Sequence, residues 1–128
     1  MNRELELILQ SFWPILKAGL VVTIPLALIS FAIAIIIAVI TALANLSNYK
    51  ILKFIFGTYV WIFRGTPLLV QLFLVFYGLP KAGIILDPWT AAIITFSLNT
   101  GAYASESIRA SILAIPKGQW EAAESLGM

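Results

Sequence analysis

The side chains that could do chemistry in this chain are few, and they favour hydrogen bonding and ion pairing over covalent catalysis. The sequence has no cysteine and no histidine, which excludes thiolate and imidazole metal sites, haem ligation by these residues, and Cys or His nucleophiles. Serine and threonine are present, but a Ser-His-Asp triad cannot form without histidine. We therefore expect no catalytic residues, no metal site and no cofactor, and a chain that is not itself an enzyme.

A nucleotide-binding loop is also missing at the one place where the glycine spacing suggests it. Gly78 and Gly83 have the separation found in a phosphate-binding loop, but Ile84 and Ile85 stand where Lys and Ser or Thr are required. If ATP drives this protein, a separate subunit must bind and hydrolyse it.

A few polar side chains interrupt long apolar runs and are the candidate functional residues. Gln71 and Asn99 could line a substrate path, but interhelical hydrogen bonding is the more common role of such groups in membranes, and we favour it. Glu106 and Arg109 stand three apart and can pair on one helix. We favour a salt-bridged helix end over a gate for this pair, and an interfacial anchor over a ligand for Arg64.

Small residues four apart indicate where helices could approach one another closely. Ser97, Gly101 and Ser105 form one such stripe, for which we expect helix packing. A second stripe consists of Ser30, Ala34, Ala38 and Ala42. Either helix packing or the general abundance of alanine in apolar helices explains this stripe.

The composition requires a nonaqueous environment around these residues. Hydrophobic residues make up 61% of the 128 residues and charged residues only 11%. This balance cannot form an apolar core within a polar shell, so membrane lipid is the expected solvent. The net charge of +2 without a basic run gives no footprint for nucleic acid.

Three apolar segments predict an all-α, polytopic transmembrane helix bundle with spans at about 18–44, 54–80 and 88–113. The first is much longer than the roughly 7–15 apolar residues of a signal peptide, so we expect an uncleaved span. The second is interrupted at 64–67. It allows a short interfacial helix followed by a span, or one kinked span, which we favour because 68–80 alone is too short to cross.

The basic residues predict an orientation for these spans. The excess of basic residues on one side is modest. For a protein of the plasma membrane, it places the N terminus outside the cell and the chain end near Lys117 in the cytoplasm. The residues expected inside are Lys50, Lys53, Arg64, Arg109 and Lys117, against Arg3, Lys17 and Lys81 outside.

A short helix at about 119–127 follows the third span. Residues 119–126 are mostly good helix formers, and Gly127 stands where a helix would end. So short a helix is marginal alone in water, so it needs a partner surface. Docking onto a cytoplasmic protein is the interpretation we favour over a helix lying on lipid headgroups.

Two sequence segments together resemble a known family. The run AYASESIRASILAIPKGQWEAAESLGM (102–128) is similar to the loop signature of permease subunits of ATP-binding-cassette importers, in which Glu-Ala-Ala is followed by three residues and then Gly. Glu121, Ala122, Ala123 and Gly127 match that motif. The segment FRGTPLLVQLFLVFYGLP (63–80) resembles the second-span region of the polar amino-acid branch.

The resemblance implies partners and a mechanism. Two permease subunits, identical or homologous, would form the path, two cytoplasmic ATP-binding subunits would power it, and an extracytoplasmic solute-binding protein would deliver a polar amino acid. The 119–127 helix would couple ATPase closure to the spans through Glu121, Ala122, Ala123 and Gly127. The amino acid itself is left open, as is the choice between homodimer and heterodimer.

The sequence also departs from the family pattern. It stops within the signature, before the Ile-x-Leu-Pro ending, and it predicts three spans where the family has about five. We therefore expect a fragment or a gene product truncated on the C-terminal side. The alternatives are a truncated scaffold that does not transport, and a secondary transporter, which usually places charged groups near the bilayer centre.

Overall fold

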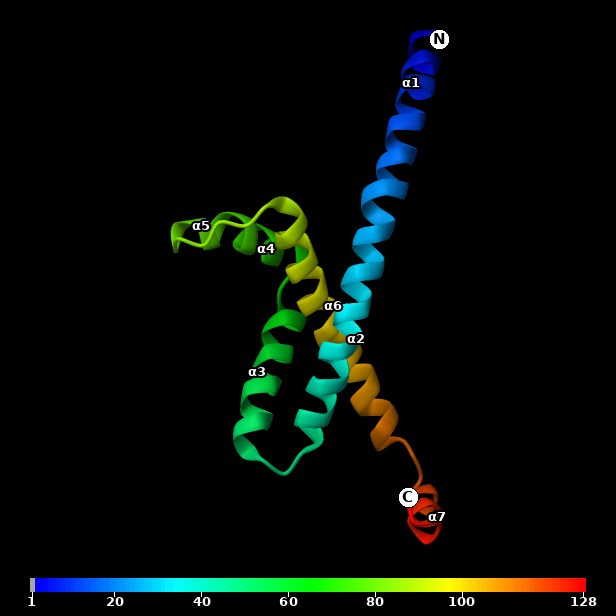
Figure 1. The fold of residues 1–128 in the computed structure, drawn as a ribbon, viewed down its shortest axis with the longest axis vertical. Coiled ribbons are helices and arrows are strands. Elements are labelled where there is room, and N and C mark those ends of the chain that lie inside the picture. The colour runs from blue at the N-terminus through cyan, green and yellow to red at the C-terminus, as the bar shows by residue number, and fades with distance from the viewer. Residues whose placement is uncertain (1) are drawn as a thin grey trace.

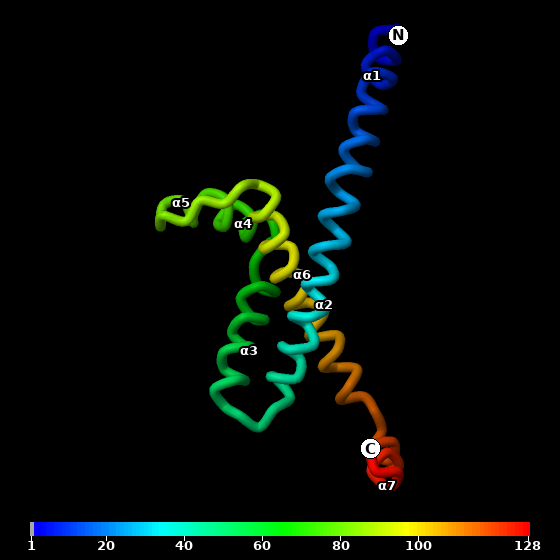
Figure 2. The backbone as a smooth tube through the Cα atoms, viewed as in Figure 1, coloured from blue at the N-terminus to red at the C-terminus, as the bar shows by residue number. Residues whose placement is uncertain are grey.

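Every element in residues 2–128, the part of the chain described by the computed structural model, is helical. The expectation of an all-α fold is therefore confirmed. The order along the chain is α1 (Asn2–Ala18), η1 (Gly19–Thr23), α2 (Ile24–Leu46), α3 (Lys50–Gly65), α4 (Leu68–Phe73), η2 (Leu74–Gly78), α5 (Leu79–Lys81), α6 (Pro88–Leu113) and α7 (Lys117–Ser125), where η1 and η2 are π-helical. Figures 1 and 2 show α1 at one end of the molecule and α7 at the other.

The first predicted span is part of a longer helix. The segments α1, η1 and α2 run as one continuous helix of 45 residues, Asn2–Leu46, so the helix begins well before residue 18. Pro25 lies in the first turn of α2, where its missing N–H is tolerated after the π-helical turn of η1. Ser47 then ends α2 in an extended conformation, with its hydroxyl donating to the Ala44 carbonyl at 2.7 Å.

The core of the molecule lies where α2 and α6 cross, as Figure 1 shows. The side chains buried there are small or polar, while the large apolar side chains of α2 point outward. Small residues let helix backbones approach closely, and lipid is the solvent that accepts the outward groups. The buried residues from both helices include Ser30, Ala34, Ala38, Thr41 and Ala42 of α2, and Ala91, Thr95, Ser97, Gly101, Ala102 and Ser105 of α6.

The second apolar region is broken at Thr66 and Pro67. The helix α3 and the arm formed by α4, η2 and α5 meet at an angle of 109°, and Figure 2 shows the arm leaving the bundle sideways. Pro67 has no backbone N–H, and Thr66 before it is extended, with ψ at 146°. The break falls where the sequence places it, but the bend is far sharper than the favoured kinked span suggests.

Few helices in residues 2–128 are long and apolar enough to cross a membrane. The helix Asn2–Leu46 qualifies, and α3 with the α4–α5 arm qualifies if the bent pair counts as one span. Polar residues on the α6 face that packs against α2 reduce the mean hydropathy of α6. By length and composition, α6 is therefore not apolar enough to count as a membrane span. The count of three spans therefore stays a prediction.

Proline and aspartate define the ends of the last two helices. Asp87 caps α6 by accepting from the Thr90 N–H at 3.3 Å and the Thr90 hydroxyl at 2.6 Å. The predicted boundaries 119–127 are shifted, because Pro116 lets α7 begin at Lys117 and Gly127 lies beyond its end at Ser125. The Met128 and Gly127 N–H groups donate to the Ala123 and Glu124 carbonyls, which forms a Schellman motif.

Candidate functional site

Gln71 supplies hydrogen-bond donors to the backbone at the break between α3 and α4. In an unbroken helix residue 67 would donate to the Phe63 carbonyl, but proline cannot. The buried Gln71 amide nitrogen donates to that carbonyl at 2.9 Å, and also to the Thr66 carbonyl at 3.1 Å and the Thr66 hydroxyl at 2.6 Å. The Thr66 hydroxyl donates to the Ile62 carbonyl at 2.9 Å. Side chains therefore satisfy carbonyls that the bend would otherwise leave unpaired in an apolar environment.

Asn99 connects this bend to α6. Its side-chain nitrogen donates to the Gln71 side-chain oxygen at 3.0 Å, which joins α6 to α4. The structure thus brings the two polar residues together in the arrangement expected for an interhelical hydrogen bond. The Gln71 side chain donates on one side of this contact and accepts on the other, so its amide group is used at both ends.

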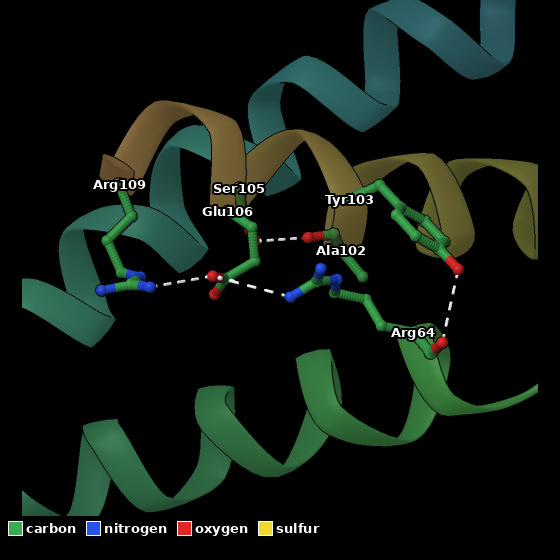
Figure 3. Close-up of polar contacts among 6 residues, drawn as sticks. All are labelled: Arg64, Ala102, Tyr103, Ser105, Glu106 and Arg109. Atoms are coloured by element: carbon green, nitrogen blue, oxygen red, sulfur yellow. Dashed lines mark hydrogen bonds and ion pairs between the residues drawn. The ribbon is translucent and has the colours of Figure 1, made fainter. Parts of the chain in front are cut away.

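A cluster of charged side chains joins α3 to α6 (Figure 3). Arg109 donates to Glu106 Oε2 at 2.9 Å, and Arg64 Nη1 lies 3.7 Å from the same oxygen. The Glu106 side chain is 24% exposed, against 48% for Arg64 and 36% for Arg109. The carboxylate is therefore the inner member of the cluster, and two cations converge on it.

Tyr103 holds Arg64 in this cluster from a second direction. Its hydroxyl donates to the Arg64 carbonyl at 3.3 Å, and the Arg64 guanidinium carbon lies 5.7 Å from the Tyr103 ring centroid. The cluster lines an open cleft of about 780 Å³ between α3 and α6, which Trp61 also lines. Two arginines and one glutamate leave this cleft with an excess of positive charge.

The predicted packing stripe lies where α6 packs against α2. Ser97, Gly101 and Ser105 are all buried on α6. A Cβ atom at Gly101 would come within 2.9 Å of Ile37 Cγ2 and 3.1 Å of the Tyr59 hydroxyl. Only glycine fits there without a shift of neighbouring atoms. The Tyr59 hydroxyl itself donates to the Leu98 carbonyl and ties α3 to the same helix.

The residues of the predicted coupling helix lie on the surface of α7. Glu121 and Ala122 are exposed, and Ala123 is half-buried. Glu121 lies 4.0 Å from Lys117, a pair in which both side chains are largely exposed. Gly127 has a φ of 82°, a backbone conformation that favours glycine, and no atom would lie within 4 Å of a Cβ added there.

Sequence reasoning missed the contacts that cross between α3 and α6. The sequence predicts Arg64 at the membrane interface by itself, whereas the structure places it beside Glu106 and Tyr103. The sequence does contain one signal for this: Arg64 and Glu106 carry opposite charges at polar interruptions of two neighbouring apolar segments. Charge sign alone does not show that α3 and α6 bring them together.

Fold and site together define an integral membrane helix bundle, because it buries small and polar residues and leaves large apolar ones outside. Comparison with known proteins identifies the family within this class. Residues 34–128 match the family described as "Binding-protein-dependent transport system inner membrane component", and the chain belongs to that family. Membership implies a location in the plasma membrane.

Curated relatives come from the amino-acid branch of this family. The chain is 57% identical to the L-cystine transport system permease protein TcyB of Bacillus subtilis (strain 168), over 96% of this chain and 53% of that protein. It is 41% identical to the arginine transport system permease protein ArtQ of the same strain, over 90% of this chain and 53% of that protein. The chain therefore spans about half the length of these relatives.

A solved structure supports the same assignment. The chain in the structure described as "Crystal structure of an amino acid ABC transporter with histidines" is 38% identical, with a TM-score of 0.83 over 95% of this chain and 57% of that chain. The arrangement of helices in Figure 1 is therefore one that occurs in an amino-acid ABC transporter.

Proposed function

We propose that this chain is the N-terminal part of a permease subunit that moves a polar amino acid into the cell in an ATP-driven importer. The observation that carries the proposal is the family match over residues 34–128, together with relatives named as amino-acid permeases. The mechanism requires partners in addition to this chain. They are two cytoplasmic ATP-binding subunits, a second permease subunit and an extracytoplasmic solute-binding protein.

The proposed orientation places α7 in the cytoplasm and α1 outside. Support comes from the modest excess of lysine and arginine near the α2–α3 loop and α7, since basic residues are retained on the cytoplasmic side. In Figure 1 this loop and α7 lie toward one end of the molecule and α1 extends toward the other. One orientation therefore puts both basic ends on the same side of a membrane.

In this proposal α7 is the coupling helix. It stands beyond the end of α6, and Glu121 and Ala122 are available on its surface for a partner. ATP-driven closure of the ATPase dimer is a two-state change, and a short helix held between the ATPase and the spans can transmit it. Gly127 ends the helix sharply, so that no side chain crowds the partner at that end.

The polar amino acid is the finer part of the proposal. The relatives are named for L-cystine, arginine and nopaline transport, and each of these solutes is a polar amino acid or a derivative of one. The 57% identity to the L-cystine permease makes cystine the first solute to test.

Uptake of radiolabelled amino acids tests the permease proposal. Cells would express the complete open reading frame with its neighbouring genes, and uptake of cystine, arginine, histidine, glutamine and glutamate would be compared with and without ATP depletion. We expect uptake of one polar amino acid that is lost on ATP depletion. Uptake that follows an ion gradient and survives ATP depletion would support a secondary transporter, and absence of uptake by correctly inserted protein would support a scaffold.

Cross-linking tests the assignment of α7 separately. The sequence has no native cysteine, so Ala122→Cys supplies a single reactive thiol on α7, and Ala82→Cys supplies a matched one in the α5–α6 loop. We expect a thiol cross-linker to join position 122, but not position 82, to the ATP-binding subunit. Cross-linking at position 82 in place of 122 would reverse the proposed orientation.

A further inference from the structure

The charged cluster between α3 and α6 carries one positive charge more than its carboxylate balances. Arg64 and Arg109 both converge on Oε2 of Glu106, so two cations share one anion (Figure 3). Arg64 lies in the last turn of α3, where it interrupts the second apolar region. A cation placed among apolar segments needs a counter-ion. The cluster is therefore suited to accept one further negative charge.

The two arginines are engaged with Glu106 to different extents. Arg109 donates a hydrogen bond to the carboxylate at 2.9 Å from one turn away on the same helix. Arg64 Nη1 lies 3.7 Å from that oxygen, which is too far for a hydrogen bond. A guanidinium group presents its N–H donors in a planar fork that fits a carboxylate with two parallel bonds. Arg64 thus keeps its donors for another anion, while Arg109 alone can neutralise Glu106.

Neighbouring groups hold Arg64 at the cleft without using these donors. Its guanidinium carbon lies 5.7 Å from the Tyr103 ring centroid, and the Tyr103 hydroxyl donates to the Arg64 backbone carbonyl at 3.3 Å. The cleft that Arg64 lines has a volume of about 780 Å³, within the range of about 300–1,000 Å³ that is typical of small-molecule sites. Asn45 and Trp61 contribute a polar and an aromatic group to its walls. The cleft can therefore hold an amino acid, with one anchored cation for its carboxylate.

We propose that Arg64 binds the α-carboxylate of the amino acid in this cleft, and that Glu106 competes with that carboxylate for Arg64. The inference rests on the proposed transport of a polar amino acid and names the group that receives it. Every amino acid has an α-carboxylate, so one arginine serves whichever side chain the solute carries. When the ligand pairs with Arg64, Glu106 stays paired with Arg109, and no charge is left without a partner.

Direct binding to the complete permease subunit, in its complex with the ATP-binding subunits, tests this inference. The probes are L-cystine, L-arginine, L-histidine, L-glutamine and L-glutamate, each paired with the amine that loss of its α-carboxylate would leave, such as cystamine for cystine and agmatine for arginine. Equilibrium dialysis without the solute-binding protein and without ATP measures binding independently of delivery and transport. We expect the amino acid that binds most tightly to bind at least about tenfold more tightly than its amine, because the amine lacks the charge-assisted pair.

Substitution of Arg64 should remove this preference for the acid. Arg64→Gln should reduce it to less than about twofold, and Arg64→Lys should restore only part of it, because an ammonium group cannot form two parallel bonds. Lys53→Gln is the matched control, since it removes one positive charge from an exposed position of the same helix and should leave the preference unchanged. Helical circular dichroism establishes that the variants fold. A preference that survives Arg64→Gln, equal binding of acid and amine, or no saturable binding of any probe would overturn the inference.

Glu106→Gln distinguishes a competitor from a purely structural partner. Loss of the competing carboxylate should tighten binding of the amino acid at least about threefold, with no gain for its amine. Weaker binding of the amino acid would show that Glu106 supports the site or receives the ammonium group, and would overturn the competition.

The uptake panel separates this inference from the proposed function. Binding that depends on Arg64 in a complex without ATP-dependent uptake would support the carboxylate site and contradict the transport proposal. ATP-dependent uptake with binding that does not depend on Arg64 would overturn this inference alone.

Discussion

At the scale of single residues, Gln71 supplies the hydrogen-bond donor that Pro67 lacks. Its amide group satisfies the Phe63 and Thr66 carbonyls and accepts from Asn99. The side chain is buried, so no water replaces it if it is removed. A bend of 109° in an apolar region is therefore tolerated because one side chain pairs with groups from three segments.

Gln71→Leu should lower the free energy of unfolding by about 1–3 kcal/mol, because it leaves buried carbonyls and Asn99 unpaired. Asn99→Leu should cost less, and a double-mutant cycle between the two should give a coupling of roughly 0.6 kcal/mol. Unfolding titrations in mixed detergent would measure these values. Gln10→Leu, at an exposed glutamine of α1, is the control and should change stability by less than about 0.5 kcal/mol. Equal losses at positions 10 and 71 would contradict the role of Gln71.

Asp87 should make the start of α6 sensitive to acid. Hydrogen bonds from the Thr90 hydroxyl and N–H lower the pKa of the Asp87 carboxyl from its usual value of about 3.9. Because the folded pKa is depressed, this contribution to stability is fully present above about pH 4 and is lost as the pH falls through the folded pKa.

Thermal unfolding of helical circular dichroism between pH 7 and 3 would measure this effect. Asp87→Asn keeps an accepting oxygen for the cap but cannot titrate. The difference in melting temperature between wild type and Asp87→Asn should therefore shift toward the variant as the pH approaches 3. A difference that does not depend on pH would show that Asp87 does not contribute through its charge.

At the scale of helices, the close crossing of α2 and α6 depends on Gly101. Gly101→Ala would push a methyl group to within 2.9 Å of Ile37, and we expect a loss of about 1–3 kcal/mol in the free energy of unfolding. Gly57→Ala is the matched control, because its Cβ would meet only Asn45 at 3.7 Å. The control should be neutral or stabilising by up to about 1 kcal/mol, since alanine favours helices. Similar losses in both variants would contradict a close crossing at Gly101.

Some of these elements could be predicted from the sequence because their cause is local. The stripe of Ser97, Gly101 and Ser105 repeats every four residues, and helical geometry alone puts it on one face. Pro67 likewise identifies the break after α3. The angle of that break depends on Gln71 and Asn99 contacts between segments, and sequence spacing does not contain such contacts.

The same distinction explains the charged cluster. Glu106 and Arg109 pair within one helix turn, so the spacing of three predicts them. Arg64 reaches Glu106 only because α3 packs beside α6. The first helix begins earlier than the sequence predicts for a related reason. The predicted span is a run without charges, and α1 is amphipathic, so its charged residues leave it outside that run.

At the scale of the whole molecule, the proposed route from ATPase to spans passes through α7 and α6. The helix α6 is in contact with α2, α3 and the α4–α5 arm, so a movement delivered at its end reaches each of these three elements. In Figure 1 α7 lies next to the end of α6, at the start of this route. A change at the end of α7 should therefore affect transport without affecting insertion.

Two glycines allow this to be tested with equal backbone strain. Gly127, after α7, and Gly83, between α5 and α6, have φ values of 82° and 88°, and a Cβ added at either position would meet no atom within 4 Å. The same substitution at either position imposes a similar conformational cost of about 1–2 kcal/mol. Only position 127 belongs to the proposed contact with the ATPase.

The most direct measurement compares Gly127→Glu and Gly83→Glu in the complete subunit, reconstituted in proteoliposomes with its ATP-binding and solute-binding partners. Amino-acid uptake and ATP hydrolysis would be followed together, with membrane insertion of each variant verified. We predict that Gly127→Glu inserts normally but loses uptake at least about tenfold, whereas Gly83→Glu keeps it. Normal ATP-dependent uptake by Gly127→Glu would contradict coupling through α7.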